Sequence, residues 1–475
     1  MAEHNNNSVH QEIKNIQFEQ PGPLKTEPAE ILHKPEDTQI KSSVTDKLYE
    51  QKGHEPPIKS AIFTMTSLSI GTACLTFTKK TIQFGFVWFG VILIIGGLAT
   101  YWTLVGLVRV AKKKGDMEYS STCRKILGKV PSYLIDVFAS LYSWGIIITY
   151  EIIINSLIGR VIYTFFIDKK IYANFAAYES LQWNTVKMKA IVLVILNVIL
   201  FPLCLAKDIG KMKFFGFFGI IALAYTIIVL IIECPFFYSY FLKNVYVKED
   251  KSTHPNWIDM TRAFNSDLDF FTGFATIVFA FANHQGALPV YRTLNTNDET
   301  IMNKVFSRSI MLTLAIYFTT YISSFLTTPL KSEDLIIFRE SIFSNDIFMN
   351  IAQISIILEL TFLVPGNYNS MRISIFHVIY GSEEVRNIPN IIISFVTLAA
   401  SALIGAVYKE ILNYISLLGG FCCTSICFLL PGWMMIKVEW ETMTKTKRFF
   451  TVLGITLLCL IGYIGGIQTV ILFFK

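Results

Sequence analysis

The chain has 475 residues, of which 53% are hydrophobic and only 16% are charged. This composition is too apolar for a soluble globular protein and predicts a chain that crosses a membrane many times. The net charge of +6 does not indicate a nucleic-acid-binding surface, because the Lys and Arg residues are scattered between apolar stretches. The eight cysteines include no CxxC pair, so neither a metal site nor a disulfide framework is expected.

The N-terminal segment differs from the rest of the chain. Residues 1–57 are rich in Pro, Glu, Lys, Asn and Gln and begin without an apolar run. We therefore expect a disordered tail and no cleavable signal peptide. Residues 58–475 are expected to form one transmembrane domain.

The stretch from Ser60 to Gly85 is long enough to span a bilayer, but its middle is a poor helix. Small and hydroxylated residues surround Gly71, and glycine disfavours the interior of a helix by about 1 kcal/mol relative to alanine. A break at Ile70-Gly71-Thr72 would require a polar, protein-lined site near the membrane midplane. Close packing of membrane helices is the alternative explanation for the same small residues.

Ten further apolar stretches follow, which gives about eleven expected spans. They lie at 86–110, 133–163, 188–205, 214–233, 269–290, 302–328, 347–364, 391–408, 411–436 and 449–474. Lys112 to Lys114 and the amphipathic stretch 117–134 make a strongly basic loop after the second span, which predicts that this loop and the N-terminus are cytoplasmic. The loop 234–267 is then expected outside, as is the C-terminus.

A second interrupted stretch, FAFANHQGALPVY, lies in the sixth expected span. The two interruptions are five spans apart, which is typical of two inverted repeats that each contribute one discontinuous helix. Spans one to five would pair with spans six to ten, and the eleventh would be peripheral. Spacing alone thus indicates a multi-span transporter with two broken helices.

Several motifs resemble the amino acid/auxin permease family, in the family's order. SLSIGTACLTF with KKTIQFG resembles its first-helix motif, MEYSSTCRKILGK its segment between helices two and three, and CLAKDIGKMKFFGFFG its turn between helices four and five. VFAFANHQGALPVYRTLN is similar to its sixth-helix signature, and LLGGFCCTSICFLLPGWMMIK to its tenth helix. The resemblance implies an all-α LeuT-like fold, with a 5+5 inverted repeat plus an eleventh helix, and secondary active amino acid transport.

A bound amino acid would need partners for its carboxylate and its ammonium. Free backbone N–H groups and the positive end of a half-helix at the first break suit the carboxylate, and freed carbonyls at the second break suit the ammonium. The carboxylate residues are expected to be Gly71, Thr72 and Ala73, where the family usually has glycine in place of Ala73. The ammonium residues are expected to be Phe279, Ala280 and Ala282.

Three side chains near the second break keep alternative roles. Phe281 and Asn283 could line the pocket for the substrate side chain or only pack. His284 could couple transport to protons, since histidine titrates in the useful range, or hold the break open by a hydrogen bond.

Intramembrane carboxylates are candidates for ion coupling, and Glu151 and Glu359 lie inside expected spans. Each could instead pair with a cation or reach toward a membrane edge. Spacing from a proline puts the ion-ligand hydroxyl of sodium-coupled relatives at Leu358, which has none, so protons are favoured over sodium. Sodium coupling through Ser67 and Thr361 is the alternative.

Lys79 and Lys80 follow the first break and are expected to extend toward the outer membrane surface, where they could attract an anionic substrate or only place their charges at the interface. A membrane amino acid sensor is a further alternative to a transporter, whereas nothing indicates a channel filter, an enzyme motif or a cofactor. The expected partners are an amino acid and the bilayer, without nucleic acid. The sequence fits either a plasma membrane or a vacuolar or lysosomal membrane.

Overall fold

The computed structural model describes residues 58–162, 186–206, 213–244, 269–294, 298–328, 334–339, 341–343, 346–381, 385–408 and 410–474. Pro56 to Lys475 form one compact unit. The predicted tail 1–57 lies outside the described residues, as do most of the predicted loop 234–267 and the basic turn before Lys213.

The described residues form helices and no strands, which agrees with the all-α prediction. In chain order the elements are α2 (Ile58–Ser69), η1 (Thr72–Thr76), α3 (Phe77–Phe84), α4 (Phe86–Lys114), α5 (Tyr119–Leu127), α6 (Lys129–Ile162), α8 (Val186–Leu205), α9 (Lys213–Asn244), α11 (Asp269–Ala280), α12 (His284–Thr293), α13 (Glu299–Thr327), η7 (Ile336–Phe338), α14 (Ile347–Tyr380), α15 (Asn387–Val407), α16 (Ile411–Leu418), η8 (Gly419–Cys423), η9 (Ser425–Leu429), α17 (Leu430–Glu439) and α18 (Lys445–Phe473).

Nine helices in the described part of the chain are long and apolar enough to cross a membrane. A tenth span results if α2 and the segment Ala73–Thr81, which are bent by 45° at a short break, count as one. The expected sixth span is divided into α11 and α12, each shorter than a full crossing. The protein is therefore a multi-pass membrane protein, and the count of eleven spans stays a prediction.

Two predicted helix ends are wrong, and both were placed beside a proline. The fifth span does not end at Glu233, because α9 continues through Pro235 to Asn244 and includes Cys234. The eighth does not end at Val364, because α14 continues through Pro365 to Tyr380. Proline is tolerated inside membrane helices, where neighbouring groups satisfy the freed carbonyl.

The amphipathic stretch 117–134 is also divided. Gly128 has a φ of +105°, a backbone conformation that L side chains rarely adopt. It ends α5 and allows α6 to begin at Lys129, so the end of the predicted stretch belongs to the third span.

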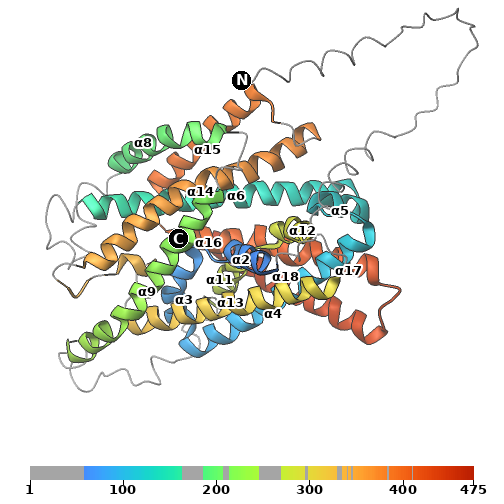
Figure 1. Ribbon diagram of the computed structural model, residues 1–475, viewed down its shortest axis with the longest axis horizontal. Coiled ribbons are helices and arrows are strands. Elements are labelled where there is room, and N and C mark those ends of the chain that lie inside the picture. Colours follow the sequence, from blue (N-terminus) through green and yellow to red (C-terminus); the bar gives the residue numbers. More distant parts are fainter. Residues whose placement is uncertain are drawn as a thin grey trace, which may run out of the picture. The chain divides into compact units, whose positions relative to one another are not determined.

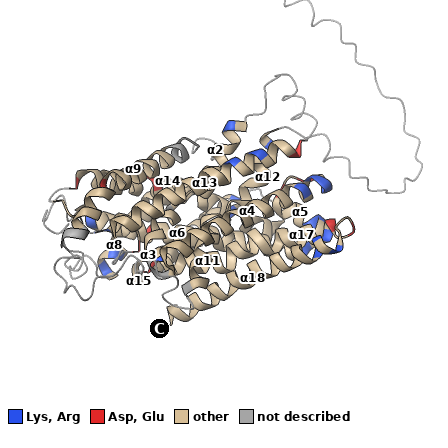
Figure 2. Ribbon diagram, turned by 90° about the horizontal axis from the view of Figure 1, so that it is seen from below, with Lys and Arg blue, Asp and Glu red and all other residues tan. Residues whose placement is uncertain are grey.

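The broken helices lie between two layers of longer helices. In Figure 1, α6 and α14 lie side by side with α8 and α15 packed against them, while α4 and α13 lie on the other side of α2 and α11. Figure 2 shows Lys and Arg gathered mostly at one end of the helices, around α5 and α17. These are the basic ends of α4 and α5 and the start of α18.

Candidate functional site

The first break leaves open space beside free backbone amides. The helix α2 ends at Ser69, and Gly71 is extended with a φ of −138° and a ψ of −170°. A Cβ added at Gly71 would meet no atom within 4 Å. The first N–H groups of η1, at Thr72 and Ala73, have no acceptor within their own helix, so they are available to an anion in that space. The Ala73 side chain is buried, and that of Thr72 lies outside the described residues.

The second break is packed. The helix α11 ends at Ala280, and α12 begins at His284. Ala280 and Phe281 are both buried, and Ala282 is half-buried beside a cavity of about 10 Å³, which is room for about one water molecule. The Phe279 ring contacts Tyr142 of α6 edge to face at 5.7 Å.

Side chains from α13 and from the unwound segment of the second break tie the two breaks together. The Tyr317 hydroxyl of α13 lies 2.6 Å from the Ser69 carbonyl and 2.6 Å from the Ala280 carbonyl. The Asn283 amide donates to the Ser69 hydroxyl at 2.7 Å. Phe281 packs edge to face on the Tyr317 ring at 5.2 Å, so in this conformation it contributes to this tie. The predicted breaks thus lie together in space.

Glu359 of α14 faces the first break. Its side chain is 5% exposed, and its γ-carbon would lie 3.0 Å from a Cβ at Gly219, so this glycine of α9 makes room for it. Glu359 is within electrostatic reach of Cys74 in η1 and Tyr150 in α6. Its Oε2 atom has no hydrogen-bond partner among the described residues.

Glu151 lies on a different face of α6. It is fully buried where α6 packs against α8 and α15, with its Cβ 4.0 Å from a Cβ added at Gly405 and with Asn197 beside it. Neither carboxylate oxygen has a hydrogen-bond partner of good geometry among the described residues. The structure therefore separates the two carboxylates: only Glu359 adjoins a break.

His284 anchors the start of α12. Its Nε2 lies 2.8 Å from the Thr103 hydroxyl of α4, which is itself 3.0 Å from the Ala99 carbonyl. If the Thr103 proton goes to Ala99, His284 donates from Nε2. Its Nδ1 has no partner among the described residues. This contact is the hydrogen bond that the structural alternative for His284 requires.

The hydroxyls considered for sodium are each bonded within their own helix. Ser67 donates to the Phe63 carbonyl and Thr361 to the Ile357 carbonyl, both at 2.7 Å. Leu358, at the position where the spacing puts the hydroxyl of sodium-coupled relatives, is 43% exposed and faces out of the bundle. The adjacent Glu359 is the residue that faces inward.

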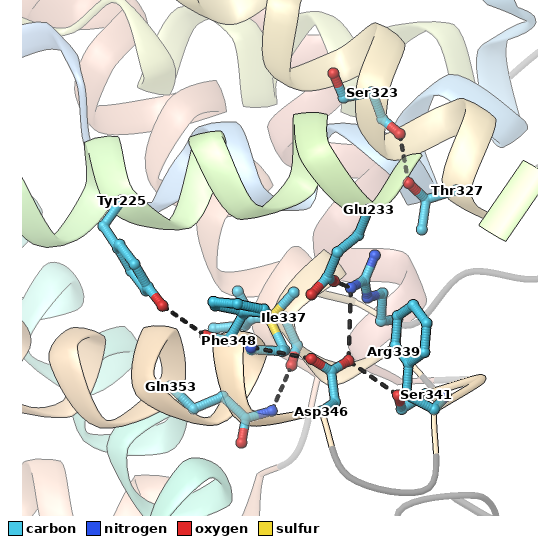
Figure 3. Close-up of polar contacts among 12 residues, drawn as sticks. Tyr225, Glu233, Ser323, Thr327, Ile337, Arg339, Ser341, Asp346, Phe348 and Gln353 are labelled. Carbon is cyan, nitrogen blue, oxygen red and sulfur yellow. Dashed lines mark hydrogen bonds and ion pairs between the residues drawn. The ribbon is translucent and has the colours of Figure 1, made fainter. Parts of the chain in front are cut away.

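Ion pairs join the connection between α13 and α14 to α9 (Figure 3). Arg339 is 4% exposed, lies over the Phe237 ring at 3.8 Å, and pairs with Glu233 of α9 and with Asp346 at 3.7 Å. Burial lowers the pKa of Arg339, while the two carboxylates act against that shift. The residues of η7 itself are buried and contact η1.

The two lysines after the first break do not both extend to the surface. Lys79 pairs with Asp334 of the same connection, at a half-exposed position. Lys80 is 4% exposed, and its Nζ lies 3.4 Å from the Thr272 hydroxyl of α11. The expectation for Lys80 is therefore wrong, because its side chain turns toward α11.

A larger groove of about 930 Å³ lies between α4, α11 and α18. Its lining is almost wholly apolar, from Ile92 and Trp102 to Leu457, with Lys447 at one end. A substrate site needs a few converging polar groups. The groove lacks them along its length, whereas the paired breaks have them.

Comparison with known families agrees with this geometry. Residues 56–472 match the model of the transmembrane amino acid transporter protein family. The chain belongs to this family. It is a membrane transport protein and not an enzyme.

Relatives within the family are distant but match over most of their length. The chain is 24% identical to sodium-coupled neutral amino acid transporter 7 of Mus musculus, over 82% of this chain and 80% of the relative. The Homo sapiens protein of the same name is also 24% identical, over 82% and 80%. Sodium-coupled neutral amino acid symporter 2 of Danio rerio is 21% identical, over 85% and 79%.

Several residues at the site of this family member were not predicted. Tyr317 lies in an apolar helix, where no spacing distinguishes it from a packing residue. The Arg339 cluster joins segments far apart in sequence, since Glu233 ends the fifth expected span while Arg339 and Asp346 lie between the seventh and the eighth. Asn283, by contrast, was considered as a pocket or packing residue, since it lies in the interrupted FAFANHQG motif.

Proposed function

We propose that this chain is a secondary active transporter of neutral amino acids, with its substrate bound between the two helix breaks. The observation that carries this proposal is the pairing of the breaks through Tyr317, next to the open space at Gly71. Neutral substrates are proposed from the names of the relatives.

Each end of an amino acid has a partner in this arrangement. The carboxylate binds in the space beside Gly71, to the amides of Gly71, Thr72 and Ala73, where the helix dipole adds favourable charge. The ammonium binds at the second break, where the carbonyls of residues 279, 280 and 282 are the candidate acceptors. The substrate side chain extends toward Phe281.

The proposed fold is a LeuT-like 5+5 inverted repeat with α18 as the eleventh helix. Support comes from the helix contacts: a contact between two helices of the bundle recurs between the two helices that hold the equivalent positions in the other repeat. The equivalent helices α4 and α13, α6 and α14, and α8 and α15 contact each other. The contact of α9 with α13 recurs as α17 with α4, that of α9 with α14 as α16 with α6, and that of α2 with α13 as α11 with α4.

Protons are the proposed coupling ion, and Glu359 is the proposed site. A carboxylate buried next to η1 can bind or release a proton as the first break changes its surroundings. The positions of His284 and Glu151 support lesser roles, since one is bonded to Thr103 and the other adjoins α8 and α15.

Sodium is the second candidate ion, because the relatives are named sodium-coupled. It would require Ser67 and Thr361 to release their present helix carbonyls and turn toward an ion. A membrane that maintains a proton gradient, vacuolar or lysosomal, suits the first candidate, and a plasma membrane suits either.

The basic end around α5 and α17 is proposed to be cytoplasmic, together with the N-terminus. A cysteine introduced near Lys213 should then resist membrane-impermeant reagents added from outside. Labelling of that cysteine from outside would reverse the orientation.

The function is tested with the purified protein in liposomes. Uptake of labelled L-alanine, L-leucine and L-glutamine is measured first with a pH gradient and then with a sodium gradient. Accumulation under the pH gradient alone supports proton coupling, and accumulation under sodium alone supports the second candidate. Binding without accumulation under either gradient would indicate a sensor and contradict the proposal.

A further inference from the structure

The Tyr317 hydroxyl occupies a position where two helices end. Ser69 is the last residue of α2 and Ala280 the last residue of α11, and their carbonyls lie equally close to this hydroxyl at 2.6 Å. The Tyr317 side chain is fully buried. Among the described residues, this hydroxyl is the hydrogen-bond donor that the structure gives to both carbonyls.

A tyrosine hydroxyl has one proton, so it can donate to only one of these carbonyls at a time. The other carbonyl is then without that donor, in a buried place where an unpaired polar group is unfavourable. An ammonium group has three N–H donors and a positive charge, so it could serve both carbonyls at once.

We propose that the Tyr317 hydroxyl fills the ammonium position of the empty site and that the ammonium of an arriving amino acid displaces it. This inference rests on the proposed function and adds a residue of α13, remote in sequence from both breaks. Tyr317 thereby favours ligands that bring several donors to this point over ligands that bring none.

The surroundings of the ring link its movement to both breaks. Phe77, the first residue of α3, packs edge to face on Tyr317 at 5.1 Å, and Phe281 packs on it at 5.2 Å. A shift of the Tyr317 ring therefore reaches the half-helix beyond the first break and the unwound segment of the second. Tyr317 is a positioning residue, because binding of the ammonium moves its ring and thereby changes the packing at both breaks.

The alternative is a permanent structural tie, in which the hydroxyl keeps both carbonyls while substrate is bound. The two views predict opposite signs for Tyr317→Phe. If the ammonium replaces the hydroxyl, the substitution destabilises only the empty site and tightens binding. If the tie is permanent, the substitution leaves binding weaker or unchanged.

The test is equilibrium binding of labelled L-alanine, L-leucine and L-glutamine to the detergent-solubilised full chain. For the ligand that wild-type protein binds best, Tyr317→Phe is expected to lower the dissociation constant about tenfold. A change of this size corresponds to the loss of one buried hydrogen bond from the ligand-free state alone. The deaminated acid of the same side chain, such as propionate for L-alanine, should show no such gain.

Tyr321→Phe is the matched control. Tyr321 lies one turn further along α13, is also buried, and packs on Phe86 and Phe89 with its hydroxyl toward Gly90. Its substitution should leave the dissociation constant unchanged. An equal gain in both variants, or an equal gain for the deaminated acid, would overturn the assignment.

A second variant keeps a hydroxyl at position 317, so this part of the test does not depend on whether Tyr317→Phe folds. In Tyr317→Phe itself, the hydrogen bond from Asn283 to the Ser69 hydroxyl remains. Replacement of Tyr317 by 3-fluorotyrosine makes the hydroxyl a stronger donor and should weaken binding. Tighter or unchanged binding with 3-fluorotyrosine would contradict the displacement. If wild-type protein binds none of the three amino acids, the proposed function itself fails; if it binds them and only the Tyr317 effects are absent, this inference alone fails.

Discussion

The two helix breaks differ in how ready they are for a ligand. At the first break, a Cβ on Gly71 would meet nothing within 4 Å, and the first amides of η1 have no acceptor within their own helix. At the second break, Ala280 and Phe281 are buried and the carbonyl of Ala280 is already held by Tyr317. The carboxylate half-site is therefore preformed, while a hydroxyl of the protein itself occupies the ammonium half-site.

The largest effect is expected at the open break. Gly71→Leu fills the proposed carboxylate space and should reduce uptake by about a hundredfold, as misplacing a reacting group can. The folded protein should be as stable as wild type, since the backbone is extended and the space is empty. Uptake in liposomes and thermal unfolding in detergent measure the two effects.

Gly366→Leu is the control for that substitution. Gly366 also has nothing within 4 Å of an added Cβ, but it lies inside the helix α14 and belongs to neither break. It should retain uptake. Near-normal uptake by Gly71→Leu would contradict the assignment of the carboxylate site to the first break.

The two buried carboxylates differ in position, because Glu359 adjoins the first break and Glu151 adjoins neither break. In a gradient of one pH unit, one coupled proton supports about tenfold accumulation, equivalent to about 1.4 kcal/mol. Glu359→Gln should lower the accumulation ratio to about one, while exchange of labelled for unlabelled substrate continues.

Glu151→Gln is the matched comparison, with the same change of chemistry in an equally buried place. It should keep the pH-driven accumulation. If Glu151→Gln abolishes accumulation and Glu359→Gln does not, the two carboxylates have been assigned in the wrong order.

The packed side of the second break is tested by Gly419→Ala. The added Cβ would lie 1.8 Å from the Ala275 carbonyl oxygen of α11, which is a backbone atom and cannot turn aside. Overpacking of this kind should destabilise the protein by about 2 kcal/mol, seen as a lower unfolding temperature. Gly71→Ala should leave the unfolding temperature unchanged. An equal decrease in the unfolding temperature of both variants would contradict the view that the first break is open and the second is packed.

The smallest effect is expected at the outer anchor of the first break. Lys79→Met removes the pair with Asp334, but Lys79 is 38% exposed, so solvent screens the interaction. The Michaelis constant for uptake should change by less than about threefold. A loss of uptake comparable to that of Gly71→Leu would make this pair part of the substrate site.

Sequence predicts the positions of the breaks because their causes are local. A glycine among hydroxylated residues is a poor helix whatever surrounds it, and the chain does leave the helix at Ile70 and Gly71. The second break was expected in the interrupted motif FAFANHQGALPVY, but the glycine and the proline of this motif lie inside α12, and the chain leaves the helix before them, at Phe281 to Asn283.

Features that depend on neighbours were not predictable. Pro235 and Pro365 would end a helix in water, but inside this bundle α9 and α14 continue through them. Tyr317 acquires its role only because α13 packs against two helix ends. The sequence offered Glu359 as a coupling candidate, but only the packing of α14 shows that this side chain is buried while the adjacent Leu358 is exposed.

The central claim is that one amino acid bridges the two breaks. The most direct test is an experimental structure of the protein in a lipid nanodisc with a transported amino acid bound. The account predicts the carboxylate beside the Gly71 amide and the ammonium at the Ser69 and Ala280 carbonyls, with the Tyr317 hydroxyl moved away. An amino acid bound elsewhere, for example beside Glu151 or in the groove at Trp102, would contradict it.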